Sequence, residues 1–373
     1  MRHLLTPCTV YTGTEVLPHH AVLINNGRIE AVLPASAEVP AEVPRRDGRG
    51  LHLAPGFVDL QIYGGVGGLF SVEPTAAVLA ALRAHTLRHG TTSFLPCLPT
   101  SPPALMRQAL ATVRAALPTT PGLLGLHLEG PYINPAKKGA HQEAFIQTPG
   151  VEAIDELLAE ASGVLRFMTL APERVSPAVV ARLRAAGVVL SAGHSAATYA
   201  QATAAFDDGF TTTTHLFNAM SGFESRAPGL VGAAYDHPAA HASIIADGVH
   251  CAYPAVRVSY KLMGERLFLI TDAVTASTTG AYRFHQQDNY FVDEQGTLAG
   301  SALTMLLAVR NCVQHVGLPL AEALRMASLY PARVVGLAHE IGRIAPGYRA
   351  DLCLFDDDFQ AHATVLGGEW HVA

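Results

Sequence analysis

Four side chains that could bind a metal or move a proton each end an apolar or β-branched stretch of the sequence. Glu129 follows the apolar run Leu123–Leu128, and His194, His215 and Asp272 end later runs of the same kind. A carboxylate at the edge of a core is costly unless a metal, a cation or hydrogen bonds hold it. Two neutral imidazoles and one carboxylate form a catalytic zinc ligand set, in which water takes the fourth position. Glu129, His194 and His215 are therefore predicted to be the metal ligands.

Asp272 is given a different role, because a fourth strong ligand would displace the reactive water. It is predicted to act as general base, taking a proton from the metal-activated water and returning it to the leaving group. A metal lowers the pKa of its water to roughly 7, so a carboxylate can do this at neutral pH. His141, in the loop after Glu129, could polarise the scissile carbonyl. The residues alone leave His141 open between that role and an ordinary surface-loop histidine.

Strand-like and helix-like segments alternate from Pro55 onward. The expected strands are Phe57–Ile62, Thr91–Pro96, the run ending at Glu129, Leu165–Leu170, Val188–His194, Thr211–His215, Ser243–Asp247 and Leu267–Asp272. The expected helices are Thr75–His89, Pro103–Leu117, Pro177–Ala186, Ala197–Asp207, Ala302–Val313 and Leu320–Val335. Eight strands with intervening helices over about 250 residues indicate an α/β fold, a (β/α)₈ TIM-like barrel. The carboxyl ends of barrel strands converge on one face, where the four polar residues would meet.

Both ends of the chain have a different, β-rich character. Short alternating segments fill residues 1–54, and Asn25-Asn-Gly27 between apolar runs predicts a hairpin. A similar pattern fills residues 340–373. We expect the two ends to pair as one small β-sandwich domain, which leaves residues 55–339 as the barrel.

Composition excludes several classes of protein. The formal net charge of −6 argues against a general nucleic-acid surface, so any anion site must be local. The five cysteines are scattered and form no CxxC pair, which favours reduced thiols in a cytoplasmic protein. The N-terminus lacks the apolar core of a signal peptide, and no apolar run is long enough to span a membrane. A nucleic-acid or membrane partner is therefore not expected.

A series of short motifs runs through the barrel part of the sequence. They are Pro55-Gly-Phe-Val-Asp59, His127-Leu-Glu-Gly-Pro-Tyr132, Lys138-Gly-Ala-His141, Ser191-Ala-Gly-His-Ser195, Thr214-His-Leu-Phe-Asn-Ala-Met220, Pro228-Gly-Leu230, Ala246-Asp-Gly-Val-His250, Ile270-Thr-Asp272 and Gly300-Ser-Ala-Leu-Thr-Met305. Together these motifs resemble the N-acetylglucosamine-6-phosphate deacetylase family of the amidohydrolase superfamily. They follow the family's order from about residue 50 to residue 335, and the terminal β unit fits the family as well.

The resemblance implies hydrolysis of the acetamide of N-acetylglucosamine-6-phosphate, giving glucosamine-6-phosphate and acetate. Glu129, His194 and His215 match the family's metal ligands, and Asp272 matches its catalytic acid/base. His141 falls where the family places the residue that polarises the substrate carbonyl. The implied cofactor is one divalent metal per subunit, with zinc the expected ion.

The resemblance also implies how the phosphate is held. The family uses an Arg and a His that reach across a dimer interface, and Arg226 and His250 match them. Asn218 and Ala219 lie where the family contacts the same phosphate. Arg suits phosphate because its planar fork makes paired, charge-assisted hydrogen bonds. We therefore expect a homodimer with shared active sites.

Two departures from the family pattern concern the substrate pocket. Many amidohydrolases carry a His-x-His pair after the first strand for a second metal, and Gln61 and Tyr63 stand at those positions. Neither side chain replaces an imidazole well as a zinc ligand, so one metal is predicted, with Gln61 counted among the substrate-binding residues. Tyr63 could narrow the acyl pocket. The segment Ala273–Gly280 lacks the family's usual proline and is shorter before Gly300. The identity of the sugar that the pocket accepts is therefore left open.

Two alternatives follow from these observations. One is a deacetylase of N-acetylgalactosamine-6-phosphate or another N-acyl amino sugar. The other is a catalytically silent sugar-phosphate binding protein that keeps the fold. The intact set of Glu129, His194, His215 and Asp272 argues against the second, because a binding protein does not need all four.

Overall fold

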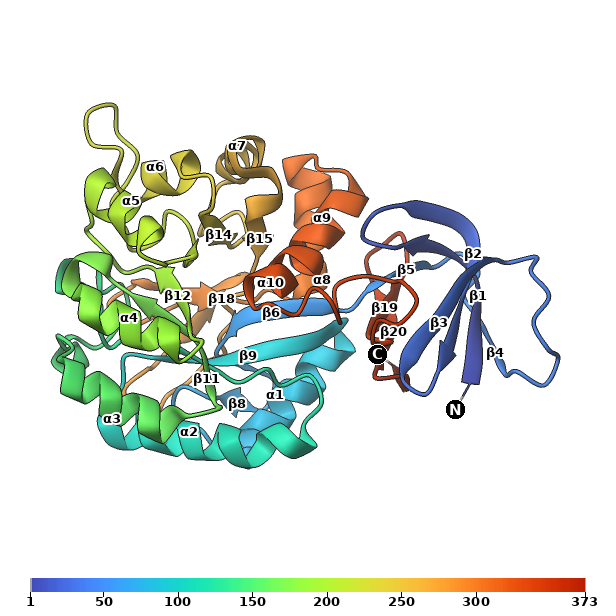
Figure 1. Cartoon of the computed structure of the whole chain (residues 1–373), viewed down its shortest axis with the longest axis horizontal. Helices are drawn as coiled ribbons and strands as arrows, with labels where there is room; N and C mark the ends of the chain where they lie inside the picture. Colours follow the sequence, from blue (N-terminus) through green and yellow to red (C-terminus); the bar gives the residue numbers. More distant parts are fainter. Residues whose placement is uncertain (1, 373) are drawn as a thin grey trace. The chain divides into compact units, whose positions relative to one another are not determined.

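The computed structural model describes residues 2–372, and its central feature is a sheet of eight strands (Figure 1). The strands pair in the order β15-β14-β13-β12-β11-β10-β9-β6, and all pairs from β9 to β15 are parallel. Their bounds are β6 (Phe57–Ile62), β9 (Thr91–Pro99), β10 (Leu126–Glu129), β11 (Leu165–Leu170), β12 (Val189–Ala192), β13 (Thr212–Thr213), β14 (His241–Ile244) and β15 (Leu267–Leu269). A parallel bridge between Ile62 and Ala273 brings the two edges together, which confirms the predicted barrel.

The barrel strands are apolar runs because both of their faces are covered. Every residue of β6 and of β9 is buried, as expected for parallel strands with helices outside them. Several strands end earlier than predicted: β13 stops at Thr213 and β15 at Leu269. His215 and Asp272 therefore lie in the loops that begin just beyond the strands.

Helices lie outside the barrel strands, as α2 to α7 show in Figure 1. Their bounds are α1 (Ala76–Arg88), α2 (Pro103–Ala116), α3 (Val151–Ala161), α4 (Pro177–Ala185), α5 (Tyr199–Asp207), α6 (Gly229–Asp236) and α7 (Tyr253–Met263). Helix α5 begins later than predicted because Thr198 caps it in a reciprocal capping box with Gln201.

The C-terminal helices differ more from the prediction. Helix α8 covers Met305–Asn311 and continues as a π-helical turn at Cys312–Val316. The single helix predicted at Leu320–Val335 is two helices, α9 (Leu320–Ala327) and α10 (Leu329–Val334). Ser328 separates them because its backbone, with φ −133° and ψ −70°, is not helical.

A small sheet that the sequence did not predict follows Asp272, as an insertion between β15 and α8. Its three antiparallel strands are β16 (His285–Gln287), β17 (Tyr290–Val292) and β18 (Leu298–Ser301). Residues of this insertion pack in an apolar cluster with a segment that includes the short strands β7 (Gly64–Gly65) and β8 (Gly68–Leu69). The members of this cluster include Tyr63, Leu69, Cys97, Val274, Tyr282, Phe284 and Phe291. The insertion therefore borders the segment that follows β6.

Strands from both ends of the chain pair in one sheet, which confirms the predicted pairing of the two ends. Its order is β21-β20-β19-β5-β1-β2-β3, and β4 pairs with β1. The bounds are β1 (Arg2–Tyr11), β2 (Val16–Asn25), β3 (Arg28–Pro34), β4 (Arg45–Asp47), β5 (His52–Pro55), β19 (Leu352–Phe355), β20 (Ala361–Leu366) and β21 (Glu369–Val372). Asn26 and Gly27 both have positive φ, 48° and 77°, which suits the predicted hairpin turn. Alternate residues of β2 join two different apolar clusters, so both faces of the sheet carry buried residues.

The chain divides into two compact units. One consists of Leu60–Leu82 and Leu95–Leu303, and the other contains the remaining residues, including α8 to α10. The boundaries expected from the sequence, residues 1–54 with 340–373 against residues 55–339, remain a prediction. Within residues 2–372, no helix has the length and apolar character needed to cross a membrane.

Candidate active site

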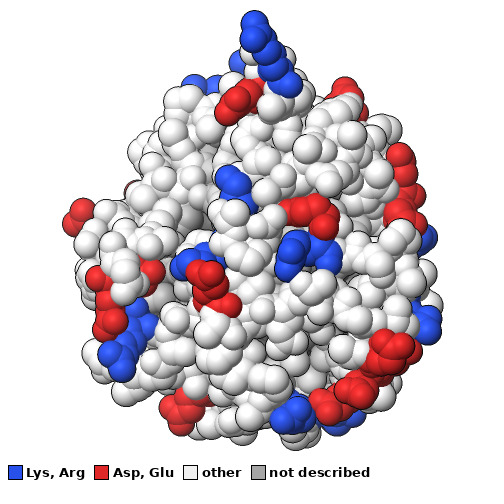
Figure 2. Space-filling model, turned by 90° about the vertical axis from the view of Figure 1, so that its left-hand side faces the viewer, with Lys and Arg blue, Asp and Glu red and all other residues white. Residues whose placement is uncertain are grey.

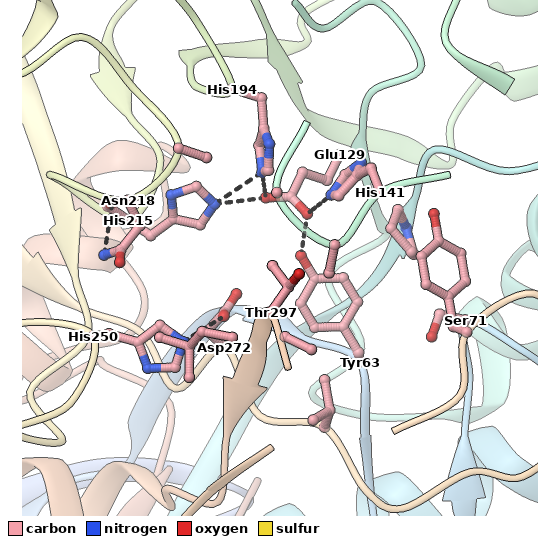
Figure 3. Close-up of a pocket in the computed structure, with 18 of the residues that line it drawn as sticks. Tyr63, Ser71, Glu129, His141, His194, His215, Asn218, His250, Asp272 and Thr297 are labelled. Carbon is pink, nitrogen blue, oxygen red and sulfur yellow. Dashed lines mark hydrogen bonds and ion pairs between the residues drawn. The ribbon is translucent and has the colours of Figure 1, made fainter. Parts of the chain in front are cut away.

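A cavity of about 330 Å³ opens where the barrel strands end (Figure 3). Its lining residues include Glu129, His141, His194, His215, His250 and Asp272. These residues come from the loops and strand ends after β10, β12, β13, β14 and β15. The polar residues that were predicted to meet at the carboxyl ends of the strands therefore do line one cavity.

Glu129 is the last residue of β10, and its side chain is only 2% exposed. The next residue, Gly130, has φ 90°, and a Cβ added there would lie 2.2 Å from Thr100 Oγ1. Both facts require glycine at this position. Gly130 thus turns the chain immediately after the carboxylate without displacing Thr100, which supports His141.

Three of the predicted catalytic and metal-binding residues have left-handed backbone conformations. The φ angles are 47° at His194, 34° at His215 and 54° at Asp272. Such angles cost about 1–3 kcal/mol for a residue other than glycine and persist only where the surroundings hold them. Strain of this kind gathers at functional sites, and here it marks the same three residues that the sequence singled out.

The two oxygens of the Glu129 carboxylate have different neighbours (Figure 3). Oε1 lies 3.2 Å from His194 Nε2 and 2.9 Å from His215 Nε2. The two imidazole nitrogens are themselves 3.2 Å apart. Three potential ligand atoms therefore surround one point.

The tautomer of His194 indicates what that point can hold. Its Nδ1 lies 2.9 Å from the carbonyl oxygen of Lys137, which can only accept, so Nδ1 carries the proton. In the neutral ring Nε2 then presents a lone pair toward the Glu129 carboxylate. Two acceptors facing each other at 3.2 Å repel unless a cation lies between them. His215 Nδ1 is buried without a hydrogen-bond partner among the described residues.

The spacing fits a divalent ion. Two nitrogen ligands about 2.0–2.1 Å from a tetrahedral zinc lie about 3.3 Å apart, close to the separation of the two imidazoles. The ligand atoms of Glu129, His141 and His194 also lie within 4.8 Å of one another and form a possible metal-binding group. The geometry therefore offers two candidates for the third ligand, His141 and His215.

Hydrogen bonding favours His215 over His141 as that ligand. The backbone N–H of Thr100 donates to His141 Nδ1 at 3.4 Å, so in neutral His141 the proton lies on Nε2. That Nε2–H donates to Glu129 Oε2 at 2.9 Å. A nitrogen that carries a proton cannot bind a metal, but it can donate to a substrate carbonyl. This is the role that the sequence resemblance implied for His141.

The pKa shifts agree with a metal-binding state. Burial, together with the neighbouring His194, lowers the pKa of His141 to about 4. Burial also lowers the pKa of His215. Burial alone would raise the pKa of Glu129, but the imidazoles of His194 and His141 hold this pKa well below its ordinary value. Neutral imidazoles and an ionised carboxylate are the forms that bind metal ions.

Gln61 and Tyr63 fill the space beside Glu129. Gln61 Nε2 lies 3.0 Å from Glu129 Oε1, 2.8 Å from Asp272 Oδ1 and 2.8 Å from the Tyr63 hydroxyl. The Tyr63 hydroxyl donates to Glu129 Oε2. Burial raises the pKa of Tyr63 well above its ordinary value. Both residues were recognised from the sequence as departures from a His-x-His pair. Their contacts with Glu129 could not be predicted from the sequence.

His250 lies in the cavity of its own chain, beside Asp272. Its Nε2 is 4.0 Å from Asp272 Oδ2, and its Nδ1 donates to Asp247 Oδ2 at 2.6 Å. Asp247 Oδ1 also accepts hydrogen bonds from the backbone N–H groups of Val249 and His250, at 2.9 and 2.8 Å. The buried Asp247 carboxylate therefore fixes the ring and aims Nε2 into the cavity. Asp247 lies in the motif that ends at His250, but its residue type alone indicated no role for it.

Of the other predicted phosphate ligands, two line the cavity and one does not. Asn218 and Ala219 line the cavity. Arg226 is exposed in the loop between β13 and α6, which extends away from the neighbouring helices in Figure 1, and it does not line this cavity. Within one chain the cavity therefore has no arginine from that loop.

The unpredicted insertion supplies the apolar side of the cavity. Val274, Tyr282, Phe284 and Leu298 line it, together with the buried hydroxyl of Ser71, which has no hydrogen-bond partner among the described residues. The altered segment after Asp272 thus does border the pocket, as the sequence comparison with the family suggested. Only the unusual length and composition of this segment could have pointed to these residues.

Comparisons with known proteins find relatives over nearly the whole chain. Residues 53–370 match the Amidohydrolase family, and residues 3–53 match the NagA composite domain. The N-acetylglucosamine-6-phosphate deacetylase of Haemophilus influenzae is 37% identical, over 99% of this chain and 99% of that protein. The N-acetylgalactosamine-6-phosphate deacetylase of Escherichia coli O157:H7 is 34% identical, again over 99% of both chains.

A solved structure has the same fold over its full length. The crystal structure of N-acetylglucosamine-6-phosphate deacetylase from Pasteurella multocida has a TM-score of 0.96 with this chain. The two share 35% sequence identity, and the match covers 100% of each chain. The likeness therefore includes both the barrel and the sheet formed by the chain ends.

Proposed function

The chain belongs to the amidohydrolase family, and we propose that it hydrolyses the acetamide of N-acetylglucosamine-6-phosphate to glucosamine-6-phosphate and acetate. The observation that carries this proposal is the contact of Glu129 Oε1 with the Nε2 atoms of His194 and His215, on the same cavity as Asp272. A ligand set of this kind beside a second carboxylate suits metal-assisted hydrolysis.

Glu129, His194 and His215 are the proposed ligands of one divalent ion, for which we propose Zn²⁺. When bound, such an ion polarises a carbonyl and lowers the pKa of a water to roughly 7. The nitrogen-rich donor set suits zinc better than magnesium or calcium, which prefer oxygen ligands. Because Gln61 and Tyr63 replace a second pair of imidazoles, we propose a single ion per chain.

Two residues of the chain would handle protons during the reaction. Asp272 takes a proton from the attacking water and delivers it to the departing amine, with Gln61 holding its Oδ1 at 2.8 Å. With substrate bound, His141 turns the Nε2–H that otherwise donates to Glu129 Oε2 toward the acetyl carbonyl oxygen, where negative charge develops. Thr100 fixes the His141 ring through its backbone N–H and its hydroxyl. Gln61 thus contacts the acid/base directly and is proposed to border the bound substrate.

The substrate phosphate is proposed to lie toward Asn218, Ala219 and His250. Asn218 and His250 lie on the side of the cavity away from Ser71 (Figure 3). This anion site is local. Basic and acidic side chains are interspersed on the face that Figure 2 shows, without a continuous basic area. The distribution matches a small anionic substrate better than a nucleic acid.

The direct test measures acetate released from N-acetylglucosamine-6-phosphate and from N-acetylgalactosamine-6-phosphate by the zinc-loaded protein. Each sugar phosphate is assayed separately. We expect N-acetylglucosamine-6-phosphate to have the higher kcat/KM. A higher value for the other epimer would favour the second candidate, which the 34% identity to an N-acetylgalactosamine-6-phosphate deacetylase supports. Binding of either sugar phosphate without acetate release would favour the silent binding protein.

We further propose a cytoplasmic location. All five cysteines are free and buried, which suits a reducing compartment. The buried thiols contribute no chemistry at the site, because burial raises the pKa of Cys8, Cys251 and Cys312 to about 12.

The proposed homodimer supplies Arg226 to the cavity of the partner subunit. Support comes from its exposure in a projecting loop and from the lack of an arginine of that loop in the cavity of its own chain. Mixing inactive Asp272→Asn subunits with Arg226→Ala subunits is expected to restore activity, because one site in each hybrid dimer has both residues intact. Recovery is measured by acetate release after subunit exchange. A mixture no more active than its separate components would contradict shared sites.

A further inference from the structure

We infer that Tyr63 is a positioning residue for the metal carboxylate, whose hydroxyl restricts Glu129 to binding one ion through one oxygen. This inference rests on the proposed ligand set of Glu129, His194 and His215. It concerns a residue that stands where many amidohydrolases carry the second imidazole of a His-x-His pair.

The direction of each hydrogen bond follows from the donors present. The amide nitrogen of Gln61 can only donate, and it lies 2.8 Å from the Tyr63 phenol oxygen. The phenol hydrogen is therefore left to point at Glu129 Oε2. His141 Nε2–H donates to the same oxygen at 2.9 Å. Glu129 Oε2 thus receives two hydrogen bonds.

These two donors occupy the oxygen that faces away from the imidazole pair. A carboxylate oxygen accepts about two hydrogen bonds, one at each lone-pair site. Oε1 alone is then directed at the point between His194 and His215. With Oε2 free, a carboxylate can instead grip one ion with both oxygens or bridge two ions. The Tyr63 hydroxyl excludes both of these arrangements.

The Tyr63 ring is held firmly enough to do this. The residue is 6% exposed and belongs to the apolar cluster that includes Leu69, Cys97, Val274 and Phe284. The hydroxyl therefore reaches Glu129 from a fixed ring rather than from a mobile surface chain. Partners of this kind orient the ligands that touch a metal, and their loss typically weakens metal binding about 10- to 100-fold.

Tyr63→Phe tests the inference because it removes only the hydroxyl. We expect the Kd for Zn²⁺, measured by competition with a chromophoric chelator, to rise about 10- to 100-fold. We also expect the visible spectrum of the Co²⁺-substituted protein to change toward that of a higher coordination number, because Oε2 can turn to the ion. Tyr63→Leu removes the same hydroxyl with a different shape and is expected to weaken binding at least as much.

Tyr282→Phe is the matched control. Tyr282 lines the same cavity and belongs to the same apolar cluster, but its hydroxyl donates to the carbonyl oxygen of Thr100 at 2.5 Å. Its loss is expected to leave the Kd for Zn²⁺ within twofold of the unsubstituted protein and the Co²⁺ spectrum unchanged.

The outcomes separate this inference from the proposed function. Unchanged Kd and Co²⁺ spectra in both Tyr63 variants would overturn the positioning role while leaving the metal site intact. An equal loss in Tyr282→Phe would overturn it as well, because the effect would then belong to the cavity wall. Failure of the unsubstituted protein to bind any ion would instead overturn the proposed metal site, and with it the inference.

Discussion

Replacing Asp272 by asparagine is expected to lower kcat for deacetylation by about 10²- to 10⁴-fold, the usual contribution of a general acid/base. Asparagine keeps an oxygen that can accept the hydrogen bond from Gln61, now 2.8 Å from Asp272 Oδ1, so the local structure should persist. It cannot take the proton of the attacking water. Steady-state acetate release measures kcat, and elemental analysis measures metal content, which we expect to stay at about one ion per chain.

The control for this substitution is Asp207→Asn. Asp207 is exposed at the end of α5 and does not line the cavity, so kcat should be unchanged. If Asp272→Asn kept more than a tenth of the kcat with its metal bound, Asp272 would not be the acid/base. Loss of the metal together with activity would instead make Asp272 a ligand.

Glu129→Gln is expected to remove the metal and, with it, nearly all activity. The substitution replaces the charged Oε1 that lies 2.9 Å from His215 Nε2 and 3.2 Å from His194 Nε2. A metal ion contributes several kcal/mol to the stabilisation of the transition state, so activity should fall by about 10³-fold or more. Metal content per chain and acetate release are the two measurements. Treating the unsubstituted protein with a chelator should cause the same loss of metal and activity. Added Zn²⁺ should restore activity to the chelator-treated protein but not to the Glu129→Gln variant.

Glu322→Gln separates metal loss from the general effect of changing a buried glutamate. The Glu322 side chain is 8% exposed and accepts hydrogen bonds from Arg325 Nε at 2.9 Å and from the Tyr330 hydroxyl at 2.8 Å. We expect this variant to unfold at a lower temperature, because it loses a charged partner of Arg325, but to keep its metal. A Glu129→Gln protein that still held one ion would contradict the proposed ligand set.

The position of the site followed from a simple rule applied to the sequence. Glu129, His194, His215 and Asp272 each end an apolar or β-branched run, and parallel barrel strands bring their carboxyl ends together. The rule needs no contact information, because alternation of strands and helices determines the order and direction of the strands. It succeeded even though β13 has only two residues and β15 three, since the loops start at the same face.

The same reasoning could not anticipate the surroundings of these residues. Tyr63 and Glu129 are 66 positions apart, and Tyr282 and Thr100 are 182 apart. Patterns of apolar residues describe one element at a time and say nothing of which side chains meet across such distances. The apolar side of the cavity escaped prediction for this reason.

Residue types, their order along the chain and the alternation of elements were thus enough to indicate a barrel hydrolase with one metal site and a carboxylate acid/base. The contacts that determine the role of each residue within the site could be seen only in the tertiary structure. Which Glu129 oxygen faces the two imidazoles, which nitrogen of His141 carries the proton and that His250 lies beside Asp272 depend on separations of 2.6 to 4.0 Å. Packing between distant segments determines such distances, and no local pattern encodes them.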